Sequence, residues 1–170
     1  TENLVVSNGI MYIWNNKNLS SRELEINIRD QLGVRQQLLN PKEIHDLEPN
    51  IKPIYDGGVF YSYAKHTNNP RRLLLKLFDL VLEKGGKFNK YQIKDINFDE
   101  EKPVLRTESQ RFVFDKIVIA CGALSKKFTN DLFENVPLDT ERGYHIHFKD
   151  CEHLISRPVV FSNRGFGMTP

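Results

Sequence analysis

A run of residues near the middle of the chain ends in small side chains that would let another molecule approach the backbone. Residues 112–120 begin with alternating polar and apolar side chains and continue as an apolar run typical of a strand buried on both faces. Cys121, Gly122 and Ala123 follow directly. Small residues allow close approach to a strand end, where open α/β sheets bind their ligands. The pattern alone favours a buried strand and a tight turn, and it leaves a ligand contact open.

Cysteine and histidine side chains suggest two further chemistries, both weakly. Cys121 could act as a nucleophile, but this needs a nearby base and a lowered thiol pKa, and the sequence indicates neither. His145, His147, Cys151 and His153 are ligand types that suit zinc. Without a second compact ligand pair, the pattern favours histidines at a surface or cleft, and Cys121 is better explained as a small core residue.

A cationic and aromatic pair precedes a strand-like stretch near the end of the chain. Arg142, Gly143 and Tyr144 could hold a carboxylate and cover a flat ring, because guanidinium groups bind carboxylates through two parallel hydrogen bonds. An exposed turn is the commoner structure for such a sequence. No glycine-rich phosphate loop occurs, since Gly165 and Gly167 lack both the third glycine and the strand–turn–helix setting.

Composition excludes several classes of protein. The 170 residues contain 24 Lys and Arg against 22 Asp and Glu, a net charge of +2, which is too balanced for a dedicated nucleic-acid binder. No apolar run approaches the roughly 20 residues of a membrane span. Two cysteines suit a reducing compartment, and we expect a cytoplasmic protein, with attachment to the inner membrane surface left open. There is no initiator Met or signal peptide, and both ends look like cuts in a longer chain.

The elements that must position these residues indicate a mixed α+β fold, with a largely antiparallel sheet and flanking helices. Capping and apolar spacing predict helices from Ser20 or Ser21 to about Leu32, from Asn40–Pro41 to before Pro49, from Asn69–Pro70 to Gly85, and weakly over 125–133. Branched and aromatic runs predict strands at 4–6, 9–14, 59–63, 87–98, 104–107, 111–120, 143–148 and 158–161.

Several of these segments, in this order, resemble the D-amino acid oxidase superfamily of flavin-dependent amine and amino-acid oxidoreductases. Residues 115–125 resemble the strand that passes close to FAD in that family. Residues 47–49 with 57–60 resemble its Leu-Glu-Pro and Gly-Gly stretches, residues 68–74 its Asn-Pro helix start, and residues 136–144 the stretch that follows the flavin strand. The likeness covers nearly all of the chain and is nearest to the bacterial D-amino acid dehydrogenase branch.

The resemblance implies an FAD-dependent enzyme that oxidises D-amino acids or related amines to imines and then 2-oxo acids. It implies FAD contacts at Ile93 and at Ala120, Cys121, Gly122 and Ala123. Substrate contacts would come from Arg142 and Tyr144, while no general base can be named. Oxidation of glycine or sarcosine is an alternative. Another is a non-enzymatic binding module with a ligand or partner face on residues 59–63.

The family's amino-terminal Gly-x-Gly-x-x-Gly segment and its closing glycine-rich segment are missing from this sequence. We therefore expect an interior fragment: residues 1–63 from the substrate domain, 64–135 from the FAD domain and 136–170 from the substrate domain again. Alone it should be inactive and should not retain FAD. Apolar surface left uncovered should cause self-association or loosened segments near residues 64–135.

Overall fold

The computed structural model describes residues 4–15, 20–98, 101–129 and 136–170. The chain forms two compact units, one from Thr1–Lys84 with His147–Pro170 and one from Gly85–Ile146. Helices and strands are mixed, and the pairing between neighbouring strands is mostly antiparallel, so the expected α+β class is confirmed. The predicted division at residues 63 and 135 concerns the domains of a longer protein and stays a prediction.

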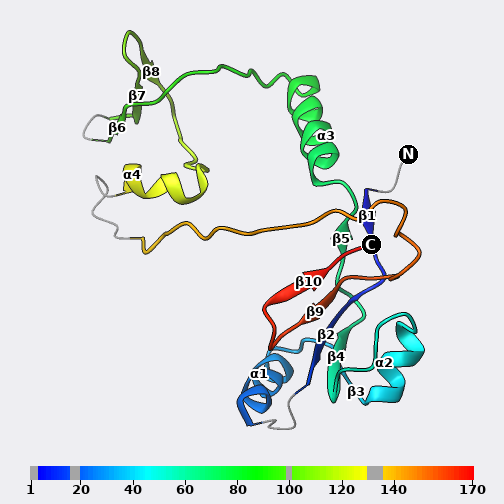
Figure 1. The fold of residues 1–170 in the computed structure, drawn as a ribbon. Helices are drawn as coiled ribbons and strands as arrows, with labels where there is room; N and C mark the ends of the chain where they lie inside the picture. Colours follow the sequence, from blue (N-terminus) through cyan, green and yellow to red (C-terminus); the bar gives the residue numbers. More distant parts are fainter. Residues whose placement is uncertain (1–3, 16–19, 99–100, 130–135) are drawn as a thin grey trace. The chain divides into compact units, whose positions relative to one another are not determined.

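The first unit is built on a five-stranded sheet in the order β10-β9-β2-β4-β3 (Figure 1). The central strand β2 (Ile10–Trp14) pairs antiparallel with β4 (Gly57–Tyr61) and parallel with β9 (Val159–Phe161). The edges are β3 (Gln37–Leu39) and β10 (Phe166–Met168). The C-terminal strands β9 and β10 therefore join the same sheet as β2, near the beginning of the chain.

Side chains of β2 alternate between two different surroundings. Met11 and Ile13 are fully buried on one face, as the period of two in a strand requires. They belong to a core formed by Met11, Ile13, Leu39, Ile44, Ile51, Tyr55, Val159 and Phe161. A glycine is required at position 58, next to this core, because a Cβ there would lie 2.9 Å from the Tyr12 carbonyl oxygen.

Helix α2 (Pro41–Leu47) covers the core face and begins as predicted. The Asn40 side chain accepts hydrogen bonds from the backbone of Lys42 and Glu43, and the Glu43 carboxylate accepts one from the Asn40 backbone. This capping box fixes where the helix starts. Ile44 is then fully buried in the core.

The opposite face of the sheet carries helix α1 (Ser20–Gln31). The Arg22 guanidinium lies 4.8 Å from the Trp14 ring centre, and that of Arg29 lies 5.6 Å from the Tyr61 ring centre. After the helix, Gly33 turns the chain with a φ of 70°. The predicted capping by Ser20 or Ser21 concerns side chains outside the described residues.

A buried carboxylate joins the two chain segments of the first unit. Glu48 accepts hydrogen bonds from the Ser156 backbone at 3.0 Å and the Ser156 hydroxyl at 2.6 Å. It also forms an ion pair with Arg157 Nε at 2.8 Å. The Glu48 side chain is 2% exposed, and more than a hundred residues separate it from these partners in sequence.

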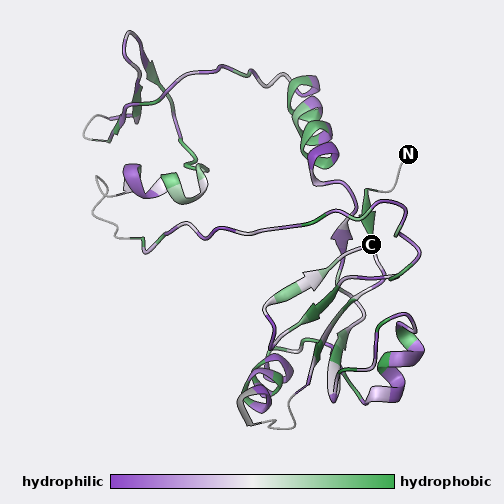
Figure 2. Ribbon diagram, in the orientation of Figure 1, coloured by the Kyte–Doolittle hydropathy of each residue, from purple (hydrophilic) through white to green (hydrophobic). Residues whose placement is uncertain are grey.

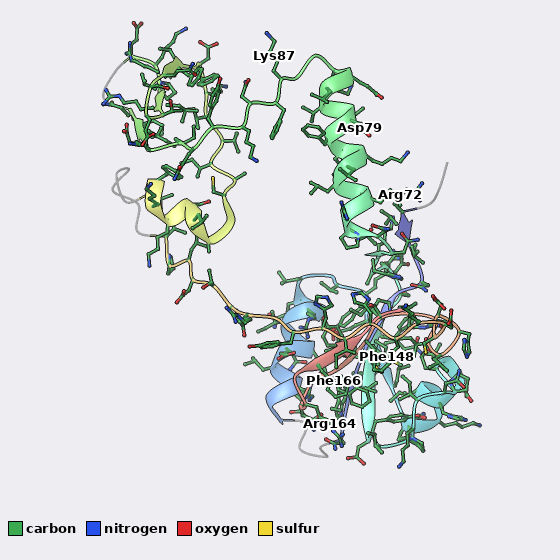
Figure 3. All side chains as sticks on the ribbon, turned by 45° about the horizontal axis from the view of Figure 1, so that its top comes forward. Arg72, Asp79, Lys87, Phe148, Arg164 and Phe166 are labelled. Carbon is green, nitrogen blue, oxygen red and sulfur yellow. The ribbon has the colours of Figure 1, made fainter. Side chains whose placement is uncertain are left out.

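Helix α3 (Pro70–Glu83) is the predicted amphipathic helix. Asn69 caps it by accepting from the Arg72 backbone at 2.9 Å, and Gly85 follows with a φ of 85°. Figure 2 shows its hydrophobic residues along the helix, and Figure 3 shows Arg72 and Asp79 on it. None of its residues is buried. Before it, β1 (Val5–Val6) pairs with β5 (His66–Thr67), which confirms the predicted strand near residue 5.

The second unit contains a three-stranded antiparallel sheet of β6 (Asp95–Asn97), β7 (Val104–Arg106) and β8 (Arg111–Val113). Within this sheet, Ile96 and Val104 are the buried residues. A 3-10 turn, η1 (Gly122–Ser125), leads into the short helix α4 (Lys126–Thr129). The weak helix predicted over 125–133 is present to Thr129, and its remaining residues lie outside the described part.

Three strand predictions are wrong in extent or existence. The strand expected over 87–98 is regular only at Asp95–Asn97, and the one expected over 111–120 only at Arg111–Val113. Residues 143–148 form no strand, although the described part includes all of them. A strand forms where a neighbouring strand exchanges backbone hydrogen bonds with it, and none of the described sheets includes residues 143–148.

Candidate functional site

The turn at residues 120–123 is where the sequence places its clearest ligand contact. Cys121 and Gly122 are exposed, and Gly122 has a φ of 57°, which glycine adopts without steric cost. The Cys121 backbone N–H donates to the Ser125 hydroxyl at 3.1 Å, and the Leu124 N–H donates to the Cys121 carbonyl at 3.2 Å. These two bonds hold the turn in its shape.

Open space surrounds the backbone of this turn. A Cβ built on Gly122 would meet nothing within 4 Å. Ala120 is exposed and Ala123 half-buried, and both have only a methyl side chain. The edge of a flat ring can therefore approach this backbone, and the residues present fit the flavin contact that the resemblance implies.

The apolar run before the turn does not form the buried strand that the sequence predicts. Residues 117–120 form no strand, and Val118 is 88% exposed. The expected burial on both faces is thus wrong for this structure. Such a strand requires neighbouring strands on each side, and the sheet that the described residues of the second unit form consists of β6, β7 and β8, without residues 117–120.

Cys121 is not a core residue. Its side chain is exposed and its thiol is free, so the expected small core cysteine is wrong here. The described residues contain no group of three or more His, Cys, Asp or Glu side chains that could hold a metal ion.

Ile93 lies two residues before β6 and is half-buried. The next residue continues the sheet edge, because the Lys94 N–H donates to the Arg106 carbonyl at 2.8 Å. Close by, the Tyr91 and Phe112 rings lie 5.3 Å apart. The assignment of Ile93 to an adenine contact stays a prediction.

Arg142 and Tyr144 lie in an extended, exposed segment of the same unit. The Tyr144 side chain is 88% exposed. No described contact joins either residue to the turn at 120–123, so the structure does not bring the predicted FAD and substrate residues together. Their roles stay predictions.

A cavity that is open to solvent at the surface of the first unit gathers residues that the sequence did not group. It has a volume of about 750 Å³ and is lined by Ile10, Tyr12, Arg29, Gly33, Val34, Arg35, Tyr61, Tyr63 and Ala64. Beside it, a smaller cavity of about 440 Å³ reaches Trp14 and Arg22. The aromatic strand 59–63 was a signal for part of this site, but the arginines come from α1 and the loop after it.

The electrostatics of this cavity follow from its aromatic and cationic lining. Burial raises the pKa of the Tyr61 phenol, while Arg29 beside it acts in the opposite direction. Tyr61 therefore keeps its proton at neutral pH and can donate a hydrogen bond. The Arg35 guanidinium contacts the Tyr63 hydroxyl and lies 4.7 Å from the Tyr63 ring centre.

No described helix is long and apolar enough to cross a membrane.

Residues 4–170 match a family model described as FAD dependent oxidoreductase (DAO). The chain is 29% identical over 150 residues to a D-amino-acid oxidase of Bradyrhizobium diazoefficiens, covering 88% of this chain and 36% of that protein. It is 27% identical over 134 residues to a D-amino acid dehydrogenase of Neisseria meningitidis, covering 76% of this chain and 32% of that protein.

Solved structures share the fold. The glycine oxidase of Bacillus cereus matches with a TM-score of 0.72 at 19% identity, over 98% of this chain and 46% of that one. The L-proline dehydrogenase of P. horikoshii matches with a TM-score of 0.63 at 14% identity, over 74% of this chain and 34% of that one. The chain therefore spans about a third of the curated relatives and less than half of these structures.

Proposed function

Because the chain belongs to the DAO family of FAD-dependent oxidoreductases, we propose that the protein containing it oxidises D-amino acids or related amines. The names of two relatives, a D-amino-acid oxidase and a D-amino acid dehydrogenase, support this substrate class. The observation that carries the proposal is the open turn of small residues at 120–123, in a chain whose family match runs from residue 4 to 170.

In this proposal the turn gives FAD access to the backbone. Gly122 keeps the space beside the turn clear, and Ala120, Cys121 and Ala123 add only small side chains. The Ser125 hydroxyl holds the Cys121 N–H, which fixes the turn before any ligand binds. Ile93 would contact the adenine end through its backbone.

Substrate binding is assigned to the segment after the flavin turn. Arg142 would pair with the substrate carboxylate, since its planar guanidinium can donate two parallel hydrogen bonds. Tyr144 would cover the substrate and exclude water. The chemistry that bound FAD would supply is two-electron oxidation: the substrate would lose a hydride equivalent from Cα and a proton from nitrogen, and water would hydrolyse the resulting imine to a 2-oxo acid and ammonia.

The experiment is an activity panel on the product of the complete reading frame. We expect a flavin absorption spectrum and oxidation of D-amino acids, measured both with oxygen and with a quinone-like dye as electron acceptor. Activity confined to glycine or N-methyl amines would instead support the alternative of glycine or sarcosine oxidation. A pure protein without flavin, which FAD does not restore, would contradict the proposal and favour a binding module.

The 170-residue chain is expected to behave differently from that protein. Most donors for the FAD phosphates lie in the family's glycine-rich segment, which this sequence lacks. The isolated chain should therefore bind FAD weakly and show no turnover. Stoichiometric flavin in the purified chain would overturn this part of the proposal.

A further inference from the structure

The cavity between α1 and the sheet contains none of the residues assigned to FAD or substrate, and it lies within the first unit. We propose that it is a second ligand site, which binds a small carboxylate with a flat apolar body. The proposal goes beyond the oxidation of amines, because it needs neither FAD nor Arg142 and Tyr144. It rests on three features of the cavity: its charge, its aromatic walls and the way α1 is held over it.

Both charged residues that line the cavity are arginines. Arg29 is paired with Glu25 at 3.1 Å, so its charge is already balanced. Among the described residues no carboxylate pairs with Arg35, whose guanidinium contacts the Tyr63 hydroxyl instead. A guanidinium beside a phenol, without an acidic partner, matches the needs of an incoming carboxylate.

The remaining walls suit a flat apolar group. The Tyr12 and Tyr61 rings lie 5.8 Å apart in an edge-to-face arrangement, and Ile10 and Val34 add aliphatic surface. A volume of about 750 Å³ is within the range of small-molecule sites. The tyrosine hydroxyls supply further hydrogen-bond donors, since Tyr61 stays protonated at neutral pH.

The way α1 contacts the sheet keeps this space open. Its contacts to the sheet's aromatic residues are made by the long side chains of Arg22 and Arg29, while Leu24 and Ile28 are exposed. Gly33 then turns the chain so that Val34 and Arg35 line the same cavity. A helix packed through interlocking leucines would have closed the gap.

The test is isothermal titration of the purified protein with 3-phenylpropionate, and with 3-phenylpropanamide as the uncharged match. We expect the carboxylate to bind at one site and the amide at least about tenfold more weakly, because only the carboxylate gains a charge-assisted bond. Arg35→Gln should weaken carboxylate binding to a similar extent. Arg164→Gln, which removes an exposed arginine in the β9–β10 turn (Figure 3), should leave it unchanged.

Two further variants test the cavity a second time and separate this proposal from the proposed amine oxidation. Tyr63→Phe keeps the ring and removes the hydroxyl that Arg35 contacts, so it should also alter carboxylate affinity if Arg35→Gln fails to fold. Arg142→Gln should abolish amine oxidation but not this binding, which separates the two proposals. Equal binding of acid and amide, no binding of either, or binding that is insensitive to both cavity variants would show that the arginines only cover the aromatic rings.

Discussion

The Tyr55 hydroxyl is a polar atom placed in the core without a hydrogen-bond partner among the described residues. Its ring is buried in the core of the first unit, and burial raises the pKa of the phenol above its usual value. An unsatisfied buried hydroxyl lowers stability. We expect Tyr55→Phe to raise the free energy of unfolding by about 1 kcal/mol at neutral pH, measured by urea denaturation.

The same substitution should change the response to alkali. Since the phenol pKa is higher in the folded state, the unfolded chain releases this proton first, and stability falls as the pH rises above about 10. Tyr55→Phe should reduce that fall. Tyr91→Phe, at an exposed ring, is the control. A large loss of stability in Tyr55→Phe would show that the hydroxyl does have a partner.

In the proposed function, flavin access depends on Gly122. Its φ of 57° makes Gly122→Ala strained by about 1 kcal/mol, and the added methyl would occupy the open space beside the turn. In the complete protein we expect a clear loss of FAD occupancy, measured by the ratio of flavin to protein absorbance. Gly165→Ala is the matched control, because Gly165 has a φ of 67° and equally open surroundings. Equal occupancy in both variants would place the flavin elsewhere.

At the scale of elements, the Glu48 carboxylate links the end of α2 to the returning segment before β9. It accepts hydrogen bonds from Ser156 and Arg157, and it lies three residues before Ile51 of the core. Removing one member of a buried ion pair leaves the other uncompensated. Glu48→Ala should therefore lower the free energy of unfolding by about 3 kcal/mol, measured by urea denaturation.

Two comparisons sharpen that measurement. Removal of both partners, in Glu48→Gln with Arg157→Gln, should cost less than the sum of the single substitutions, because the two residues interact directly. Glu43→Ala should cost only about 1 kcal/mol, since it removes one bond of the α2 capping box. Additive effects of the Glu48 and Arg157 substitutions would argue against the buried pair.

At the scale of the whole molecule, the amount of exposed apolar surface stands out. Helix α3 buries none of its leucines, and Val118, Tyr144, Ile146 and Phe148 are also exposed. Soluble monomers rarely expose such an extent of apolar surface without a partner. We expect the 170-residue chain to associate with itself as its concentration rises, measured by light scattering after size-exclusion chromatography.

A matched pair of variants locates this association. Leu74 on α3 is 66% exposed and Leu24 on α1 is 64% exposed, so both can become lysine without loss of core packing. Leu74→Lys should reduce self-association, and Leu24→Lys should reduce it less, because residue 74 lies in the predicted region 64–135. A chain that stays monomeric at high concentration would refute the expectation.

Features that depend on interactions between residues close in sequence could be predicted from the sequence. The Asn40 and Asn69 side chains start their helices by accepting backbone hydrogen bonds from residues within three positions, so both starts were predictable. The branched and aromatic residues of Ile10–Trp14 likewise indicated a strand. The order of the motifs was sufficient to indicate the flavoprotein family, which the family match over residues 4–170 supports.

Tertiary structure decided what depends on distant partners. Residues 117–120 and 143–148 have strand-like sequences but form no strand, because pairing needs a neighbouring backbone that local sequence cannot specify. The pairing of Glu48 with Arg157, and the cavity formed by Tyr12, Arg35 and Tyr63, likewise join side chains from separate segments. Residue types set which interactions are possible, whereas the return of the chain to the β2 sheet determines which side chains meet.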